Sequence, residues 1–317
     1  MQGGITSKLI VFFYSIVLPI IVGYAAKKIT KIPKEKFDIL IKINLAVFMP
    51  VTVALAFWNM SITKDVIFLP LIGFVVPLVG AVFGYFLSRG RYASDNERGS
   101  FIISSMLSNR LQIGGLSAYI IFGEIAYVYV NLVILFQAIT NYVIGHSIGN
   151  FFGNRDEIKS GNTVKALVFR ITNISILGII AGVILNLSGI PRPDAITGIV
   201  DPLIKVTAWL MLLAVGAAIE FRNAMKYLRD IPLIFFSKFV LLPAVSALFA
   251  FLLLKDPIAI ATVIIIGMGP VAINAVVVAK MNNLNQAVTI SAFLTTSTFF
   301  LAVLFPILLV VMQKIFA

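Results

Sequence analysis

Apolar runs of about 20 residues recur along the whole chain, and they constrain its fold more than any other feature. A helix needs about 20 predominantly apolar residues to cross the hydrocarbon core of a bilayer. Membrane β-barrels show short alternating segments instead, and this pattern is not visible in the sequence. Charged residues make up only 12% of the chain, whereas soluble domains carry about 25%. The sequence therefore predicts an all-α polytopic membrane protein.

Ten membrane-spanning helices are predicted, with short connections between them. They cover residues 7–26, 36–59, 66–88, 98–123, 125–148, 164–188, 197–220, 228–254, 257–281 and 285–313. The connections are too short for a soluble domain. The first apolar run is long enough to be a spanning helix, so we expect no cleavable signal peptide.

Lys and Arg alternate sharply between successive loops. The loops after odd-numbered helices contain Lys27, Lys28, Lys31, Lys34, Lys36, Arg89, Arg91, Arg98, Arg155, Lys159, Lys165, Arg222, Lys226 and Arg229. The loops after even-numbered helices contain Lys64, Arg192 and Lys255. Cytoplasmic loops are enriched in Lys and Arg. We therefore expect a multi-pass protein of the cell membrane with both termini outside, and we assign the net charge of +12 to topology rather than to nucleic-acid binding.

A constant shift of 161 residues maps the first five predicted helices onto the last five. Because each half has an odd number of helices, the second half enters the membrane from the opposite side, as in the inverted repeats of many secondary transporters. The sequence predicts a first repeat at 1–148, a short cytoplasmic linker at 149–162 and a second repeat at 163–317. The alternative explanation is simple regularity of ten evenly spaced helices.

Two predicted helices contain polar residues and helix breakers near their centres. The fourth reads SNRLQIGGLSAYIIFGE from Ser108, and the ninth reads IIIGMGPVAINAVVVAK from Ile264. The shift pairs Asn109 with Pro270 and Ile113 with Asn274. Interruptions at corresponding positions of two repeats are the best sequence indication of a transporter's binding site. We therefore expect helices 4 and 9 to be broken.

A helix broken at mid-membrane leaves backbone groups that only protein or a watery cavity can satisfy. We expect half-helices to begin near Gly114 or Gly115 and near Pro270, with the positive ends of their dipoles at the midplane. Such ends favour an anion, for example a carboxylate. The predicted substrate-binding residues are Asn109, Arg110, Gln112, Gly114, Gly115, Asn141, Pro270 and Asn274.

Two interpretations of Arg110 remain open. None of the 13 acidic residues lies near the centre of a predicted helix, so an unpaired Arg110 fits an acidic substrate. Alternatively, Arg110 is a structural residue that binds carbonyl groups at the break. Gly114 and Gly115 likewise fit either close approach of a ligand or helix packing, and Asn274 fits either substrate binding or an interhelical hydrogen bond.

Other polar residues inside the predicted helices are weaker candidates. Asn44, Gln137, Thr295 and Thr298 are candidates for lining a cavity or coordinating an ion, although such side chains usually bond neighbouring backbone in membrane helices. The chain has no Cys and a single His, His146. With no central acidic pair either, we predict no catalytic residues, no enzymatic activity and no metal site or cofactor. Sodium coupling through Asn, Ser, Thr and backbone carbonyls remains open.

The segment SNRLQIGGLSAYIIFGEIAYVYVNLVILFQAITNYVIG resembles the fourth and fifth helices of the auxin efflux carrier family, including its prokaryotic members. The matching positions are Asn109, Gly114, Phe122, Gly123, Glu124, Asn141 and Gly145. The segment GPVAINAVVVAKMNNLNQAVTISAFLTTSTFF is similar to the family's penultimate helix and to the start of its last helix. Leu111, Gln112 and Leu116 replace the family's Gly, aromatic residue and Pro, which bears on the shape of the first break and suggests a more polar site.

The resemblance implies ten helices in two inverted five-helix repeats, with broken helices 4 and 9 crossing. It also implies an elevator mechanism, in which helices 3–5 and 8–10 form a transport domain that moves against a scaffold of helices 1, 2, 6 and 7. The expected function is export of small organic anions, such as carboxylates or auxin-like acids, by a homodimer in membrane lipid. The alternatives are a sodium-coupled organic-anion symporter of the bile acid type, and a membrane sensor or receptor, for which no output domain is visible.

Overall fold

The computed structural model describes residues 4–29, 34–60, 64–92, 94–153, 174–219 and 231–316. Within these ranges the chain is predominantly helical and has no strand, although one isolated antiparallel bridge joins Ser108 to Val271. Six helices are long and apolar enough to cross a membrane: Ile5–Ile29, Ile39–Trp58, Phe68–Ser88, Asp194–Ala218, Ile231–Leu253 and Gln286–Phe316. The predicted all-α class is confirmed, and these helices agree with a polytopic membrane protein.

A first group of helices is built on α12 and α4. It comprises α1 (Ile5–Phe12), η1 (Phe13–Val17), α2 (Leu18–Ile29), α3 (Lys34–Ile43), η2 (Asn44–Phe48), α4 (Met49–Trp58), α11 (Ile174–Leu187) and α12 (Asp194–Ala218). Helix α11 packs along α4, while α12 packs along α2 and α3. At Gly178 and Gly182 the backbone of α11 lies against the backbone of Pro50 and Ala54, so that a Cβ atom has no room. Small residues allow this close approach between membrane helices.

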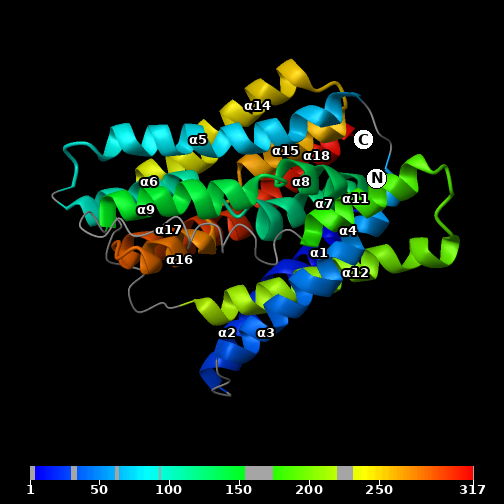
Figure 1. Ribbon diagram of the computed structural model, residues 1–317, viewed down its shortest axis with the longest axis horizontal. Coiled ribbons are helices and arrows are strands. Elements are labelled where there is room, and N and C mark those ends of the chain that lie inside the picture. Colours follow the sequence, from blue (N-terminus) through cyan, green and yellow to red (C-terminus); the bar gives the residue numbers. More distant parts are fainter. Residues whose placement is uncertain are drawn as a thin grey trace.

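A second group contains the remaining described helices. It comprises η3 (Lys64–Ile67), α5 (Phe68–Ser88), α6 (Asp95–Met106), η4 (Arg110–Gly115), α7 (Leu116–Phe122), α8 (Glu124–Val133), η5 (Ile139–Gly145), α9 (His146–Gly153), α13 (Ile231–Phe236), η9 (Ser237–Leu241), α14 (Leu242–Leu253), α15 (Pro257–Gly267), α16 (Ile273–Met281), α17 (Gln286–Phe299), η10 (Phe300–Leu304) and α18 (Phe305–Phe316). Helix α5 packs against α6, α8 and α14, and α15 packs against α8 and α14. This group fills the upper and left-hand part of Figure 1, and the first group fills the lower right.

The predicted helix at 125–148 is interrupted, which corrects the expectation of one continuous span. Helix α8 ends at Val133 and η5 begins at Ile139. The interruption lies where the backbone of Val133 packs against Gly73 of α5, which leaves no room for a Cβ atom there. The Thr140 hydroxyl donates to the Gln137 carbonyl at 3.0 Å and so satisfies one of the backbone groups in the turn.

The predicted linker at 149–162 is also corrected at its start, because α9 continues to Gly153. The rest of the linker and the first part of the predicted helix at 164–188 lie outside the described residues. The same holds for part of the predicted basic loops, namely for Lys31, Arg155, Lys159, Lys165, Arg222, Lys226 and Arg229.

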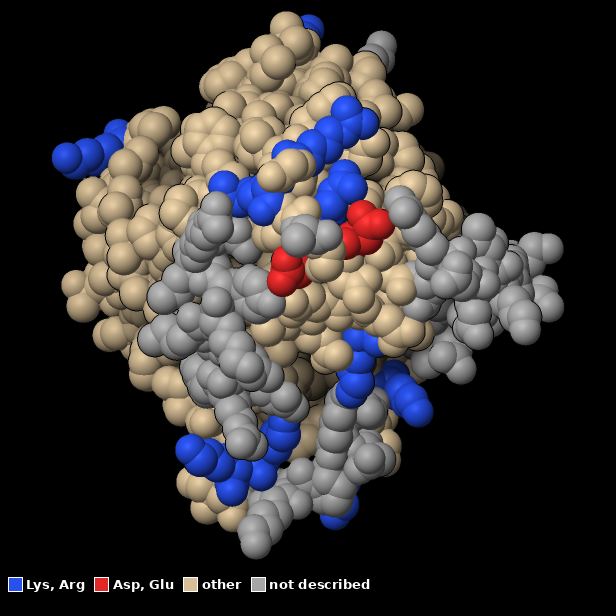
Figure 2. Space-filling model, turned by 90° about the vertical axis from the view of Figure 1, so that its left-hand side faces the viewer, with Lys and Arg blue, Asp and Glu red and all other residues tan. Residues whose placement is uncertain are grey.

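One end of the molecule carries a group of basic side chains. Figure 2 looks onto the left-hand end of Figure 1, where α5 ends and α6 begins, and shows Lys and Arg side chains around a smaller group of Asp and Glu. Arg89 and Arg91 follow α5, and Arg98 lies near the start of α6. Both chain termini lie at the opposite, right-hand end in Figure 1. The basic end and the termini are therefore on opposite sides of the molecule.

Candidate functional site

The first break lies between α6 and η4. Helix α6 ends at Met106, and η4 begins at Arg110 after a turn. The Oδ1 atom of Asn109 accepts the N–H of Gln112 at 3.2 Å, as expected of an Asn at a helix N-cap. The prediction that the half-helix begins near Gly114 or Gly115 is therefore wrong. The asparagine cap sets the start earlier, and both glycines lie buried inside η4.

The second break lies between α15 and α16. Helix α15 ends at Gly267, and α16 begins at Ile273 after an N-cap residue, Ala272, in extended conformation. Pro270 thus lies in the linking segment and not in the first turn of α16, contrary to the prediction. Within the described residues no side chain caps α16. The N–H of Ala275 donates to the Ala272 carbonyl at 3.0 Å, which leaves the N–H groups of Ile273 and Asn274 for a ligand.

The two breaks cross and pair through their backbones. The N–H of Asn109 donates to the Pro270 carbonyl at 2.7 Å, and the N–H of Ala272 donates to the Leu107 carbonyl at 3.0 Å. The N–H of Val271 donates to the Thr296 hydroxyl at 3.1 Å. These bonds satisfy part of the backbone released by each break inside the protein, as non-helical backbone at membrane depth requires.

A buried lysine of η9 supports the first break. Lys238 has no solvent-exposed surface. Its Nζ donates to the Ser105 carbonyl at 2.9 Å, to the Leu107 carbonyl at 3.1 Å and to the Ser108 hydroxyl at 2.9 Å. Lys238 is absent from the predicted site, although it is the only charged residue between Ile231 and Leu253. A lone charge inside a membrane helix is expensive and therefore indicates a specific partner.

Arg110 is held by backbone and hydroxyl groups of the second helix group. Its guanidinium donates to the Gly73 carbonyl and, at 3.4 Å, to the Thr140 hydroxyl. These contacts hold Arg110 in place, but the carbonyl belongs to α5 and not to the break, as the structural interpretation had it. Within the described parts of the chain, neither Arg110 nor Lys238 forms an ion pair with a carboxylate.

A cavity of about 330 Å³ lies beside the crossing, between the two helix groups. We call it the amide cavity, because its polar lining consists mainly of the side-chain amides of Gln112, Asn131, Gln137, Asn141 and Asn274. No charged residue of the described chain lines it. Its remaining wall is largely apolar and includes one face of α3, η2 and α4, formed by Phe37, Ile41, Leu45 and Met49.

The structure brings only part of the predicted site to the amide cavity. Gln112, Asn141 and Asn274 line it, together with the weaker candidate Gln137. Asn131 also lines it, although the prediction omits this residue; the signal was an amide within an apolar helix. The other predicted substrate residues, Asn109, Arg110, Gly114, Gly115 and Pro270, form the crossing itself and do not line the cavity.

The remaining candidates have local structural contacts. Asn44 is buried and donates to the Thr207 carbonyl at 3.3 Å, which joins η2 to α12. Thr295 donates to the Ser291 carbonyl of its own helix at 2.6 Å. Thr298 is exposed. None of these three candidates lines the amide cavity.

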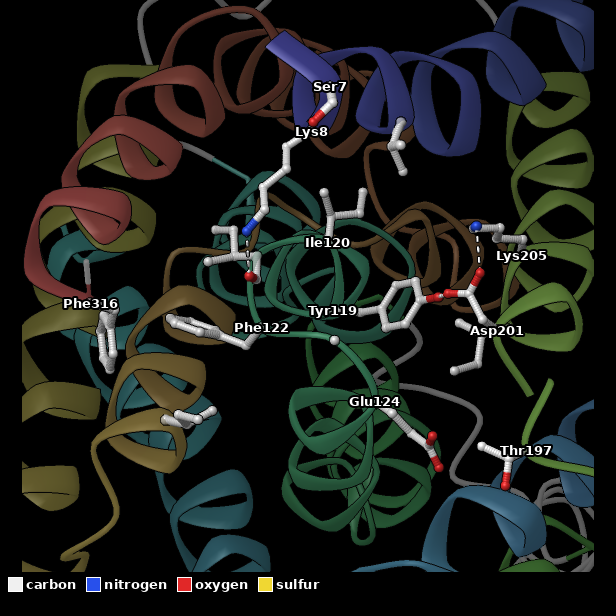
Figure 3. Close-up of a pocket in the computed structure, with 15 residues that line it drawn as sticks. Ser7, Lys8, Tyr119, Ile120, Phe122, Glu124, Thr197, Asp201, Lys205 and Phe316 are labelled. Carbon is white, nitrogen blue, oxygen red and sulfur yellow. Dashed lines mark hydrogen bonds and ion pairs between the residues drawn. The ribbon is translucent and has the colours of Figure 1, made fainter. Parts of the chain in front are cut away.

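A second cavity, of about 700 Å³, lies close to both chain ends, since Ser7 and Phe316 line it. Figure 3 shows two polar contacts across it. Lys8 of α1 donates to the Ile121 carbonyl at the end of α7, at 2.8 Å. Tyr119 of α7 donates to Asp201 of α12. Both contacts join the first helix group to the second.

An ion pair makes a third connection of this kind. Arg192, which precedes α12, binds both carboxylate oxygens of Glu124 at 2.5 and 3.1 Å. Glu124 is the first residue of α8 and lines the second cavity. The side of the molecule that carries the termini is therefore bridged by three polar contacts, which we call the terminal-side bridges.

Comparison with known proteins agrees with this architecture. The model of a family described as membrane transport protein matches residues 8–309. A search of curated proteins gave no match. The matched range includes both breaks and nearly all residues that line the two cavities. The chain therefore belongs to this membrane transport protein family, that of the auxin efflux carriers, which is a family of transporters and not of enzymes.

Proposed function

We propose that the protein is a secondary carrier that exports small organic anions, such as carboxylates or auxin-like acids, and binds them in the amide cavity. The observation that carries this proposal is the uncapped N-terminus of α16. Ile273 and Asn274 begin this helix and line the cavity. A helix N-terminus offers free N–H groups and the positive end of the helix dipole, both of which favour a carboxylate.

Buried charge near the crossing supports the same ligand class. Arg110 is 4% exposed and Lys238 is fully buried, and the described residues provide neither with a carboxylate partner. Uncompensated charges in a medium of low polarity act strongly on a nearby ligand. The amides supply hydrogen-bond donors, and the apolar wall accommodates the carbon skeleton of an organic acid.

The two helix groups support an elevator mechanism of ten helices in two inverted repeats. The first group would be the scaffold and the second the transport domain, with the amide cavity between them. The 161-residue shift pairs Asn109 with Pro270, and these two residues are hydrogen-bonded at the crossing. The same shift carries the start of η5 at Ile139 onto the start of η10 at Phe300. Both correspondences favour two inverted repeats over ten helices that are merely evenly spaced.

The alternation of Lys and Arg between the predicted loops, with Arg89, Arg91 and Arg98 at the end seen in Figure 2, supports an orientation with this end in the cytoplasm and both termini outside. In this orientation Phe37, which lines the amide cavity, follows the first basic loop, and we propose that the cavity opens to the cytoplasm near this loop. The terminal-side bridges would then close the outer side. Export would require these bridges to break as the transport domain moves.

Counterflow in proteoliposomes tests the proposal, with labelled malonate as the first probe and a panel of mono- and dicarboxylates after it. We expect saturable exchange. Removing an amide that bonds a charged ligand costs about 1.5 kcal/mol, so Asn274→Ala and Asn141→Ala should each raise KM about tenfold. Asn150→Ala, an exposed amide on α9, is the matched control and should behave as the wild type.

Two results would contradict the proposal. An unchanged KM in both Asn274→Ala and Asn141→Ala, in protein that unfolds at the wild-type temperature, would exclude the amide cavity as the binding site. Unitary currents in planar bilayers would identify a channel instead of a carrier.

A further inference from the structure

We propose that the ammonium group of Lys238 is a built-in cation of the crossing, so that the carrier needs no sodium ion there. The consequence for transport rests on the proposed carrier function, whereas the cation site itself rests only on the coordination of Nζ. In transporters with broken helices, unwound carbonyls and the C-terminal ends of half-helices coordinate the coupling cation. In this chain a lysine side chain meets such groups.

The coordination of Nζ is that of a fully bound ammonium ion. An ammonium group has three N–H donors and no acceptor. The three donors meet three oxygens within 3.1 Å, those of the Ser105 and Leu107 carbonyls and the Ser108 hydroxyl. These oxygens lie at the C-terminal end of α6, where the helix dipole is negative. The geometry therefore matches a cation site at a helix end.

The site links the two breaks. The Leu107 carbonyl accepts both the Lys238 ammonium and the N–H of Ala272, which precedes α16. The cation thus helps to hold the arm that carries the cavity-lining Ile273 and Asn274. Lys238 also does not snorkel, because none of its surface reaches solvent.

Because the Lys238 ammonium already places a positive charge at this helix end, no sodium ion is needed there. The oxygens that would coordinate sodium at this helix end are occupied by a covalently attached charge. A fixed ammonium cannot leave with the substrate, so it provides the electrostatic effect of a bound cation without coupling transport to a sodium gradient. We therefore favour a sodium-independent carrier over a symporter that binds sodium at this helix end.

Thermal unfolding of the purified full chain in detergent tests the cation site without any transport measurement. Choline, sodium, ammonium and methylammonium chloride are compared at equal ionic strength. We expect the wild type to melt at one temperature in all four salts. Lys238→Ala should melt lower in choline chloride, and ammonium or methylammonium should raise its melting temperature by about 5 °C, because a small cation binds the vacated oxygens.

Lys8→Ala is the matched control. Lys8 also donates to a carbonyl at a helix end, that of Ile121, but at the second cavity and away from the crossing. Its loss should lower the melting temperature equally in all four salts. A cation-specific recovery confined to Lys238→Ala would separate a cation site from a lysine that only fills space.

Four results would overturn the inference. The first is a Lys238→Met variant as stable as the wild type, because methionine fills the space without the charge. The second is a Lys238→Ala variant that folds but gains nothing from any cation. If the Lys238 variants do not fold, a rise of the wild-type melting temperature specific to sodium, or sodium-dependent malonate uptake by the wild type, overturns it. Absence of all malonate uptake would contradict the proposed function instead, and the melting behaviour would still report on the site.

Discussion

The two breaks at the crossing pair with each other, but different groups stabilise them. Side chains hold the first break: Asn109 caps η4, and Lys238 binds the carbonyls that end α6. The second break is held by backbone pairing and one hydroxyl, that of Thr296. Helix α16 has no side-chain cap and faces the amide cavity. This difference indicates that the first break is a fixed support, while the second keeps its donors for the ligand.

The strongest test of this division is Arg110→Met, which should destabilise the protein strongly and raise KM less than Asn274→Ala does, because the charge of Arg110 acts on the ligand only from outside the amide cavity. The substitution leaves the Gly73 carbonyl without its charged donor. Hydrogen bonds to charged groups contribute up to about 3 kcal/mol, so we expect a loss of that order in the free energy of unfolding. Thermal unfolding gives the stability, and malonate counterflow gives KM for the folded fraction.

Asn274→Ala is the companion to this test and should show the opposite pattern, with a higher KM and an unchanged melting temperature. If Arg110→Met raised KM at wild-type stability, Arg110 would belong to the substrate site. The first break would then bind the ligand and would not be only a support.

A smaller effect should distinguish the two adjacent glycines of η4. A Cβ atom on Gly115 would lie 2.6 Å from Cγ1 of Val130 and 2.8 Å from the Arg110 carbonyl oxygen, whereas a Cβ atom on Gly114 would approach no atom closer than 3.4 Å. Overpacking a buried site costs about 2 kcal/mol. Gly115→Ala should therefore lower the free energy of unfolding by about this amount.

Gly114→Ala is the internal control, because ordinary van der Waals contacts surround its added methyl group. We expect its melting temperature to stay near that of the wild type. Equal destabilisation of the two variants would mean that both glycines are required by the backbone of η4 itself and not by the packing of Val130 against the first break.

The sequence contains enough information to locate both breaks but not to describe them. Gln112, Asn141 and Asn274 are recognisable because amides are rare inside apolar helices, and the structure brings all three to the amide cavity. The start of η4 is not recognisable, since Asn109 and the glycines are competing local signals within a few residues.

The partners of Lys238 and Arg110 could not be predicted from the sequence either. Lys238 meets carbonyls more than 100 residues away in the sequence, and Arg110 meets Gly73 on another helix. Such contacts depend on how helices pack in three dimensions, whereas hydrophobic patterning reports only which residues share a local helix or face. The break positions could thus be predicted, and the division of roles between the breaks could not.

The smallest expected effect concerns Thr296, the residue whose side chain supports the second break among the described contacts. The Thr296 hydroxyl donates to the Ala292 carbonyl at 2.6 Å and accepts the N–H of Val271 at 3.1 Å. Thr296→Val keeps the shape but removes the acceptor, so the buried N–H of Val271 loses its partner. We expect a loss of about 1 kcal/mol. Amide hydrogen exchange should report it as faster exchange at Val271, with exchange at Asn109 unchanged.

Thr295→Val is the control, because the Thr295 hydroxyl bonds only carbonyls of its own helix among the contacts of the described chain. It should leave exchange at Val271 as in the wild type. If Thr296→Val also leaves this exchange unchanged, the second break depends on its backbone pairing with the first break alone. In that case Lys238 and Asn109 would stabilise both arms of the crossing through the first, and α16 would owe its position entirely to groups that never touch the ligand.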